Sequence, residues 1–243
     1  MKDPKYSFKA FDTFIGTKSN LKDKQIVEIG PGDSINTAII ANAFGAERIY
    51  LIDKGSFAVK RMSTYKEMYN LLETFGVINR DLPISNFHQI LVNSNATYMT
   101  KGILDMSKIA NNSIDIIFSN AVLEHMDPDQ ISLMMFETYR VLRFGCSAKH
   151  RIDLRDHIND EFNHLRFSNR AWNSKYLRKG GTNLNRMHIS EYVHLAETAG
   201  LSCQIEVNGP IIRSTQIKIH ESLEKWQIAP EVYSGFDLIC TKN

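Results

Sequence analysis

Two glycines, Gly30 and Gly32, follow a short apolar run that contains Glu28. Glycine lacks a Cβ atom and accepts the backbone angles of a sharp turn, so the main chain there can approach a bound molecule closely. The first amides of the following helix have no partner within that helix and can face the same molecule. A second apolar run ends in Asp53, about twenty positions further on, where nucleotide-binding folds place a carboxylate against ribose hydroxyls. These residues indicate a site for a nucleotide-type cofactor.

Position 35 separates two classes of ligand. The dinucleotide fingerprint has a third glycine three residues after the second, which lets the helix pack near a pyrophosphate. This chain has Ile35 at that position, so a pyrophosphate, and with it an NAD-dependent dehydrogenase, is disfavoured. Glu28 instead supplies a negative charge near the place where a cationic amine of a ligand would lie.

The elements that must position these residues follow from hydrophobic periodicity. Apolar runs predict buried strands over 25–29 and 48–53, and apolar residues at spacings of three and four predict helices. The aromatic residues near the N-terminus predict a helical cap within residues 1–20. The helices are expected over 6–15, 34–44, 64–75, 130–142 and 189–199, and closing strands over 201–207 and 232–240.

The Glu-x-Gly-x-Gly pattern and the distant Asp53 resemble the first two motifs of class I S-adenosylmethionine (SAM) methyltransferases. Residues 113–126 resemble the fourth strand of that family and the loop after it. Residues 140–145 resemble the approach to the fifth strand, although the family commonly has Pro-Gly-Gly where this chain has Phe144-Gly145-Cys146. The resemblance spans about residues 25 to 155. It implies an α/β fold with a doubly wound, Rossmann-like, seven-stranded and mostly parallel sheet, and SAM as the cofactor, with S-adenosylhomocysteine as its product.

The resemblance also implies which residues hold SAM. Asp105 resembles the carboxylate that takes the adenine amino group, and the backbone N–H of Met106 would meet a ring nitrogen. A helix-capping role is the alternative for Asp105. Ser119 and Asn120 are expected just past the fourth strand, near the methionine part of SAM. The expected cofactor-binding residues are Glu28, Gly30, Pro31, Gly32, Ser34, Asp53, Lys54, Asp105, Met106, Ser119 and Asn120.

Histidines and arginines gather in residues 150–188, an expected acceptor-binding insertion that follows the fifth strand and precedes the last crossover helix. Histidine is the side chain best suited to take a proton near pH 7, and arginine suits anionic groups. A structural or surface role is the alternative for each of them. The candidate catalytic residues are His125, His150, Asp153 and His157, and the candidate acceptor-binding residues are Arg155, His164, Arg166 and Arg186.

A divalent metal is an alternative interpretation of His150, Asp153 and His157, because imidazole and carboxylate groups are suitable ligands. Their spacing matches no closed metal site, so no metal is expected.

Residues 150–157, 163–167 and 182–186 resemble a narrower group, the methyltransferases encoded with bacterial surface-polysaccharide biosynthesis. Within that group the chain resembles capsule enzymes that O-methylate a phosphoramidate group. The resemblance implies an O-methyltransferase that acts on a small phosphorylated or nucleotide-linked precursor. A sugar-hydroxyl O-methyltransferase and a catalytically silent SAM-fold binding protein are the alternatives. An anionic acceptor oxygen would suit the arginine donors, whereas a hydroxyl would need a base.

Composition agrees with a single methyltransferase domain over residues 1–243. A chain of 243 residues can bury a substantial core, and α/β folds of this size often form one domain. The formal net charge of +2 gives no support for a nucleic-acid partner. No apolar run reaches transmembrane length and no signal-peptide core is present, so we expect a cytoplasmic protein without membrane insertion. The partner is expected to be a small-molecule acceptor, and composition leaves the oligomeric state open.

Overall fold

The computed structural model describes residues 2–17, 19–78, 84–156, 161–179, 184–213 and 216–243. Its seven described strands form one sheet in the order β3-β2-β1-β4-β5-β7-β6. Strands β1 to β4 pair in parallel, whereas β6 and β7 are antiparallel. The predicted α/β class with a mostly parallel, Rossmann-like sheet is therefore confirmed.

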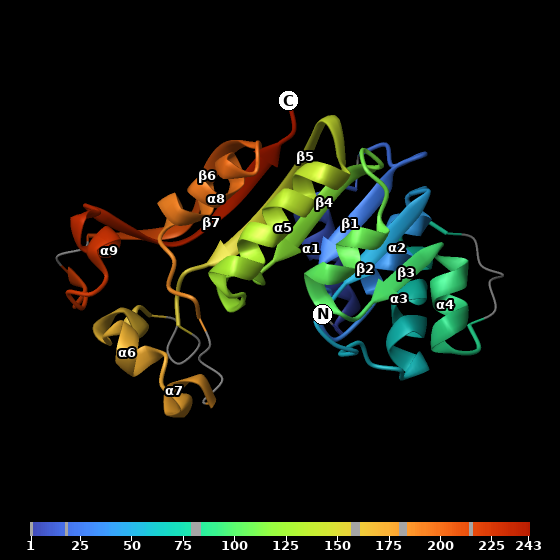
Figure 1. Ribbon diagram of the computed structural model, residues 1–243. Coiled ribbons are helices and arrows are strands. Elements are labelled where there is room, and N and C mark those ends of the chain that lie inside the picture. The colour runs from blue at the N-terminus through green and yellow to red at the C-terminus, as the bar shows by residue number, and fades with distance from the viewer. Residues whose placement is uncertain (1, 18, 79–83, 157–160, 180–183, 214–215) are drawn as a thin grey trace. The chain divides into compact units, whose positions relative to one another are not determined.

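The chain packs as two compact units. Unit 1 comprises residues 1–120, 137–148 and 242–243, and unit 2 comprises residues 121–136 and 149–241. Figure 1 shows their elements in chain order from blue to red. The prediction of a single domain stays a prediction.

Unit 1 contains the first four strands and the helices between them (Figure 1). Its core is formed by apolar side chains of β1 and β2 and of the inward faces of α1, α2 and α3. The ring of Phe11 in α1 stacks on Phe44, with 6.0 Å between ring centroids, so the N-terminal aromatic residues pack as expected. The elements are α1 Pro4–Phe14, β1 Gln25–Ile29, α2 Asn36–Ala43, β2 Arg48–Ile52, α3 Met62–Thr74, α4 Phe87–Asn93, β3 Ala96–Met99, the 3₁₀ helix η1 Gly102–Lys108, and β4 Ile114–Asn120.

Helix α5 Pro128–Val141 and strand β5 Leu142–Asp153 have residues in both units. In unit 2, Tyr192 of α8 packs edge-on against Phe236 of β7, at 5.7 Å between ring centroids. A capping box between His188 and Glu191 fixes where α8 begins. The remaining elements are η2 Leu123–His125, η3 Asn163–Arg166, α6 Asn169–Trp172, α7 Lys175–Lys179, α8 Ile189–Thr198, β6 Ser202–Arg213, α9 Glu224–Ile228 and β7 Glu231–Thr241.

Two boundaries differ from the sequence-based expectation. Ser119 and Asn120 are the last residues of β4 rather than the loop after it, because the ladder to β1 still pairs Ser119 with Ile29. Strand β5 extends to Asp153, so residues 149–153 belong to the strand and do not follow it. Burial alternates along this end of β5, where Ala148, His150 and Ile152 are buried. His150 therefore lies on the buried face of the strand, where every second residue points inward. The sequence pattern did not reveal this position, because histidine is polar.

Asp237 of β7 is a buried carboxylate that links the strands of unit 2. It receives a bidentate pair of hydrogen bonds from Arg151 of β5, at 2.8 and 2.9 Å, and an ion pair from Lys149 at 3.0 Å. Asn208 of β6 donates to the same carboxylate. Burial opposes its ionisation, but the bonds from Arg151 and Lys149 outweigh that cost and hold the pKa of Asp237 below its ordinary value. The carboxylate thus stabilises the unit in its charged form.

Replacing Asp237 by Asn should therefore lower the free energy of unfolding by about 1–3 kcal/mol, because two partly exposed cations lose their buried partner. Glu206→Gln is the matched control: its half-exposed carboxylate also pairs with Lys149, and its loss should cost at most about 1 kcal/mol. Urea titrations of both variants measure the difference. The effect of Asp237 should be present at neutral pH and fade below about pH 4, since a lowered pKa stabilises the fold only while the group is ionised. Equal losses in the two variants would contradict this account.

Candidate functional site

The predicted cofactor residues of unit 1 lie along one edge of its parallel sheet. The ladder pairs Ile29 of β1 with Ile52 of β2 on one side and with Ser119 of β4 on the other. Gly30 then donates its N–H to the carbonyl of Ile52, at 2.8 Å. The glycine turn, Asp53 and the end of β4 are therefore neighbours at the carboxyl ends of the strands, where open α/β sheets bind their ligands.

Asp53 braces the glycine turn. One carboxylate oxygen accepts the N–H of Gly32 at 3.1 Å, and the other accepts the N–H of Lys54 at 2.7 Å. Burial raises the pKa of Asp53 and these two bonds oppose the rise. Gly32 has a φ of 68°, and a Cβ built there would meet no atom within 4 Å. The turn thus needs glycine for its backbone angle, and the space where a Cβ of residue 32 would lie is open.

Glu28 is a buried carboxyl on β1, with 2% of its surface exposed. Its Oε2 has no hydrogen-bond partner among the described residues. Burial raises its pKa to about 8, against a hydrogen bond with Thr37 and with a further rise from the charge of Asp53. The group is therefore mostly neutral at pH 7 and has one oxygen available for a donor or a cation.

The expected adenine residues lie in η1, which is tied to β2 by a hydrogen bond from the N–H of Gly102 to the carbonyl of Asp53 at 2.8 Å. Asp105 lies inside η1, and Lys101 is the N-cap, so the N-cap alternative for Asp105 is wrong. Its carboxylate accepts the N–H of Lys101 at 2.9 Å and pairs with Lys108 at 2.5 Å. The hydrogen bond from Lys108 is the main cause of its lowered pKa. Met106 is buried beside it.

The other expected cofactor residues lie on the same edge. Pro31 and Ser34 are buried in the turn after β1, and Lys54 is exposed. Ser119 is buried, whereas Asn120 donates its side-chain amide to the hydroxyl of Tyr6 at 3.3 Å. Contact between each of these residues and SAM stays a prediction.

The candidate histidines of unit 2 lie in different environments. His150 is fully buried on β5, and burial lowers its pKa to about 4. His164 of η3 is also buried with a pKa of about 4, and its Nδ1 lies 3.9 Å from the carboxylate of Asp156. Both rings are neutral at pH 7. His125 is half-buried in η2, and His157 lies outside the described residues.

The metal interpretation depends on His157, so part of that ligand set lies outside the described residues. Within the ranges that the structure describes, no three histidine, cysteine or acidic side chains gather as metal ligands.

Two of the three candidate arginines bind parts of the protein. Arg155 makes a bidentate pair with Asp153, at 3.0 and 2.7 Å. Arg186 is buried and donates to the carbonyls of His164 and Phe167 and to the side chain of Asn169. Its φ of 58° is unusual for a residue other than glycine. Arg166 is exposed. Arg186 thus joins separate segments of the insertion, and Arg155 pairs with its near neighbour Asp153. The sequence did not distinguish these roles from anion binding.

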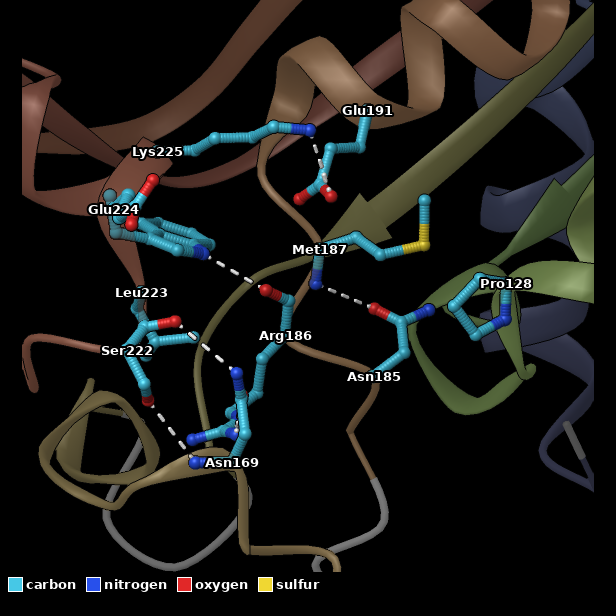
Figure 2. Close-up of a pocket in the computed structure, with 11 residues that line it drawn as sticks. Pro128, Asn169, Asn185, Arg186, Met187, Glu191, Ser222, Leu223, Glu224 and Lys225 are labelled. Carbon is cyan, nitrogen blue, oxygen red and sulfur yellow. Dashed lines mark hydrogen bonds and ion pairs between the residues drawn. The ribbon is translucent and has the colours of Figure 1, made fainter.

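Unit 2 contains a hollow with a volume of about 320 Å³. Figure 2 shows the side chains that line it. An ion pair between Lys225 and Glu191, at 3.0 Å, lies on one side, and Asn169 bonds to Ser222 on another. Its wall consists of Pro128, Asn169, Asn185, Arg186, Met187, Glu191, Ser222, Leu223, Glu224, Lys225 and Trp226. The hollow is large enough for a sugar-sized group.

A second, much smaller hollow of about 10 Å³ shares Asn185, Arg186, Met187 and Trp226 with the first. Glu124, Asp153, Leu154, His164 and Leu184 complete its wall. The sequence patterns indicated Asp153, His164 and Arg186 but not Glu124 or Asn185. Glu124 directly precedes the candidate His125 and lies just after β4, a region where ligands collect, so its position was a usable signal.

Asn185 holds the turn that carries Glu124. Its side-chain amide donates to the carbonyls of Leu123 and Met126, at 2.8 and 3.0 Å. Its backbone N–H donates to the carbonyl of Glu124 at 2.8 Å. The orientation of η2 therefore depends on the chain segment that also lines both hollows.

Among the residues that the structure describes, every helix is too short or too polar to span a membrane.

Comparisons with known proteins identify the fold. No family model and no curated protein matches the chain. Among solved structures, it is similar to a provisionally assigned SAM-dependent methyltransferase from Listeria monocytogenes, with a TM-score of 0.51, 12% identity, and coverage of 99% of this chain and 100% of that one.

It is also similar to phosphoethanolamine N-methyltransferase 2 from Haemonchus contortus, with a TM-score of 0.54 and 12% identity. The match covers 98% of this chain and 52% of that one. A third similar structure is geranyl diphosphate C-methyltransferase from Streptomyces coelicolor A3(2), with a TM-score of 0.50 and 10% identity. The match covers 98% of this chain and 79% of that one. The chain thus has the fold of the class I SAM-dependent methyltransferases.

Proposed function

We propose that the protein is a SAM-dependent methyltransferase. The observation that carries the proposal is the edge of unit 1, where the register of three parallel strands brings Glu28, the glycine turn and Asp53 together. A nucleoside fits this edge because Gly32 leaves open space and Asp53 offers carboxylate lone pairs to hydroxyl donors. An amino acid fits it because Glu28 has a buried oxygen without a partner among the described residues. SAM joins both chemical groups.

In this proposal each residue has one task. Asp53 binds the ribose hydroxyls, Asp105 and the backbone of Met106 bind the adenine, and Glu28 faces the cationic amine. When bound, SAM supplies a methyl group on a positively charged sulfur, which a nucleophile takes by in-line displacement. The protein then has to align the acceptor and accept its proton where it has one.

In this proposal, residues of unit 2 bind the methyl acceptor. We infer O-methylation of a small phosphorylated or nucleotide-linked precursor of a bacterial surface polysaccharide. The support is the resemblance of residues 150–157, 163–167 and 182–186 to enzymes of capsule biosynthesis. A phosphoramidate oxygen and a sugar hydroxyl are the two acceptor atoms that this resemblance leaves. A small precursor of this kind agrees with a cytoplasmic enzyme.

Replacing Asp53 by Ala should weaken SAM binding about ten- to a hundredfold, because charge-assisted hydrogen bonds worth about 1.5–3 kcal/mol are lost. Isothermal titration of parent and variant with SAM measures the change. Gly32→Val should weaken binding as well, through the positive φ and the filled space. Folded variants that bind SAM as tightly as the parent would place the cofactor elsewhere.

SAM binding should release a proton at pH 7, because the mostly neutral Glu28 must ionise to face a cationic amine. A pKa of about 8 before binding allows the release of up to roughly one proton per site. Titrations in two buffers with different ionisation heats measure the number released. Glu28→Gln should bind SAM more weakly. It should also release fewer protons on binding, because the glutamine side chain has no proton to lose at this pH. An unchanged proton count in the variant would remove Glu28 from the site.

A further inference from the structure

Two cysteines face each other across the antiparallel ladder of β6 and β7 in unit 2. The register pairs Cys203 with Cys240, and the pairs on either side of them follow without a shift. A register shift lies several residues away, between Asn208 and Ile211. Because directly opposite residues of an antiparallel pair point to the same face of the sheet, the two thiol side chains are neighbours.

The backbone geometry of this pair suits a disulfide. Opposite residues of an antiparallel ladder have their Cα atoms about 4.5 or 5.5 Å apart, depending on whether the two residues exchange hydrogen bonds. Disulfides join cysteines whose Cα atoms are about 4.4–6.8 Å apart. Both kinds of ladder pair fall within that range, so Cys203 and Cys240 can be bridged with at most a small shift of the backbone.

The two cysteines are free thiols that interact with each other. They share a hydrogen bond, which is the main cause of a lowered pKa at Cys203, against burial and the charge of Glu197 in α8. The same bond, together with burial, raises the pKa of Cys240. Cys203 is half-buried, whereas Cys240 is fully buried. Cys203 is therefore the thiol that ionises first and that a reagent in solution can reach.

A metal ion is a less suitable partner for this pair. Structural zinc is held by four protein ligands and catalytic zinc by three. In the part of the chain that the structure describes, no group of three histidine, cysteine or acidic side chains gathers as metal ligands. The third cysteine of the chain, Cys146, lies on β5 in unit 1, whereas Cys203 and Cys240 both belong to unit 2. The geometry thus favours a dithiol that can oxidise.

We propose that Cys203 and Cys240 are a site of reversible thiol oxidation, at which a low-molecular-weight disulfide such as oxidised glutathione closes a cross-strand disulfide. The Cys203 thiolate attacks one sulfur of oxidised glutathione and displaces the other as a glutathione thiolate, which takes up the proton that Cys203 lost. The Cys240 thiol then gives up its proton and attacks the sulfur of Cys203, which releases a second glutathione. Two protein thiols lose two electrons, and one oxidised glutathione is reduced to two glutathione molecules.

The disulfide would fasten one edge of the sheet. Strand β6 stands at the end of the strand order, with β7 as its neighbour. An edge strand is held by backbone hydrogen bonds on one side alone. A bond from Cys203 to Cys240 adds a covalent link to that side and encloses residues 204–239, which all belong to unit 2. This effect of oxidation is the same whatever reaction the protein catalyses.

The test treats the folded protein with oxidised glutathione near neutral pH and then counts the remaining thiols in denaturant with a chromogenic thiol reagent. Thiols are counted in Cys146→Ser, so that only the proposed pair can react, and in the same chain with Cys203→Ser or Cys240→Ala added. Circular dichroism establishes that each variant is folded. Mass spectrometry of the intact chains, and of unreduced peptides from the parent, identifies which sulfurs are joined.

Cys146→Ser should lose both of its thiols and the mass of two hydrogen atoms, and dithiothreitol should restore them. Peptides of the oxidised parent should be linked through Cys203 and Cys240. With Cys240→Ala added, the reaction should stop at the mixed disulfide, with one glutathionyl group on Cys203, because no second thiol displaces it. With Cys203→Ser added, Cys240 should stay reduced, because its burial keeps the reagent away.

The proposal is overturned if folded Cys146→Ser keeps both thiols under conditions in which the same chain, unfolded in urea, loses them. It is also overturned if the parent's peptides join Cys146, and not Cys203, to Cys240. Absence of a glutathionyl group on Cys203 in the chain that carries Cys240→Ala would overturn it as well. None of these measurements involves SAM, so their outcome is distinct from that of the proposed methyltransferase function.

Discussion

The register of β1 between β2 and β4 is the constraint on which the candidate cofactor site depends. Because Ile29 pairs with both Ile52 and Ser119, three segments that are far apart in sequence end at the same level. A shift of one residue in either ladder would turn successive side chains to the opposite face of the sheet. Beyond the strand ends, two further sets of bonds hold the same segments together. Gly30 donates its N–H to Ile52, and Asp53 accepts the N–H groups of Gly32 and Lys54.

Four buried carboxyl groups of this protein differ in the direction of their pKa shift. Asp105 and Asp237 are buried next to cations, and their pKa values are lowered. At Glu28 and Glu124 the loss of solvation dominates, and their pKa values rise to about 8. Bonds from Lys108 lower the pKa of Asp105 and bonds from Arg151 and Lys149 lower that of Asp237, whereas desolvation is the largest cause of the shift at Glu28 and Glu124. Charged carboxylates that are already paired stabilise the fold, whereas neutral ones with an unpaired oxygen are the ones that can respond to a ligand.

Sequence patterns predicted the fold better than the site of unit 2. Glycine spacing and apolar runs are local signals, so Gly30, Gly32 and Asp53 could be assigned to strand ends from the order of residues alone. The role of His150 could not be inferred in this way, because a polar residue at an inward strand position looks like a residue of a loop. Arg155 and Arg186 were interpreted as hydrogen-bond donors to an anionic acceptor. Arg155 instead pairs with Asp153, two residues away, and Arg186 bonds to carbonyls that only tertiary packing brings near it. Glu124, which lines the small hollow, was not singled out because the histidine beside it is a residue type more often associated with proton transfer.

Asn185 ties the turn that carries Glu124 to the segment that walls both hollows. A molecule that displaces residues 185–187 would also move the carboxyl, and the reverse holds because such coupling is reciprocal. Occupancy of the larger hollow and the position of the Glu124 carboxyl are thus thermodynamically linked. An ill-fitting molecule would lose free energy twice, in its own contacts and in the displaced turn of Glu124, so that selection among bound molecules would be sharper than the shape of the hollow alone provides.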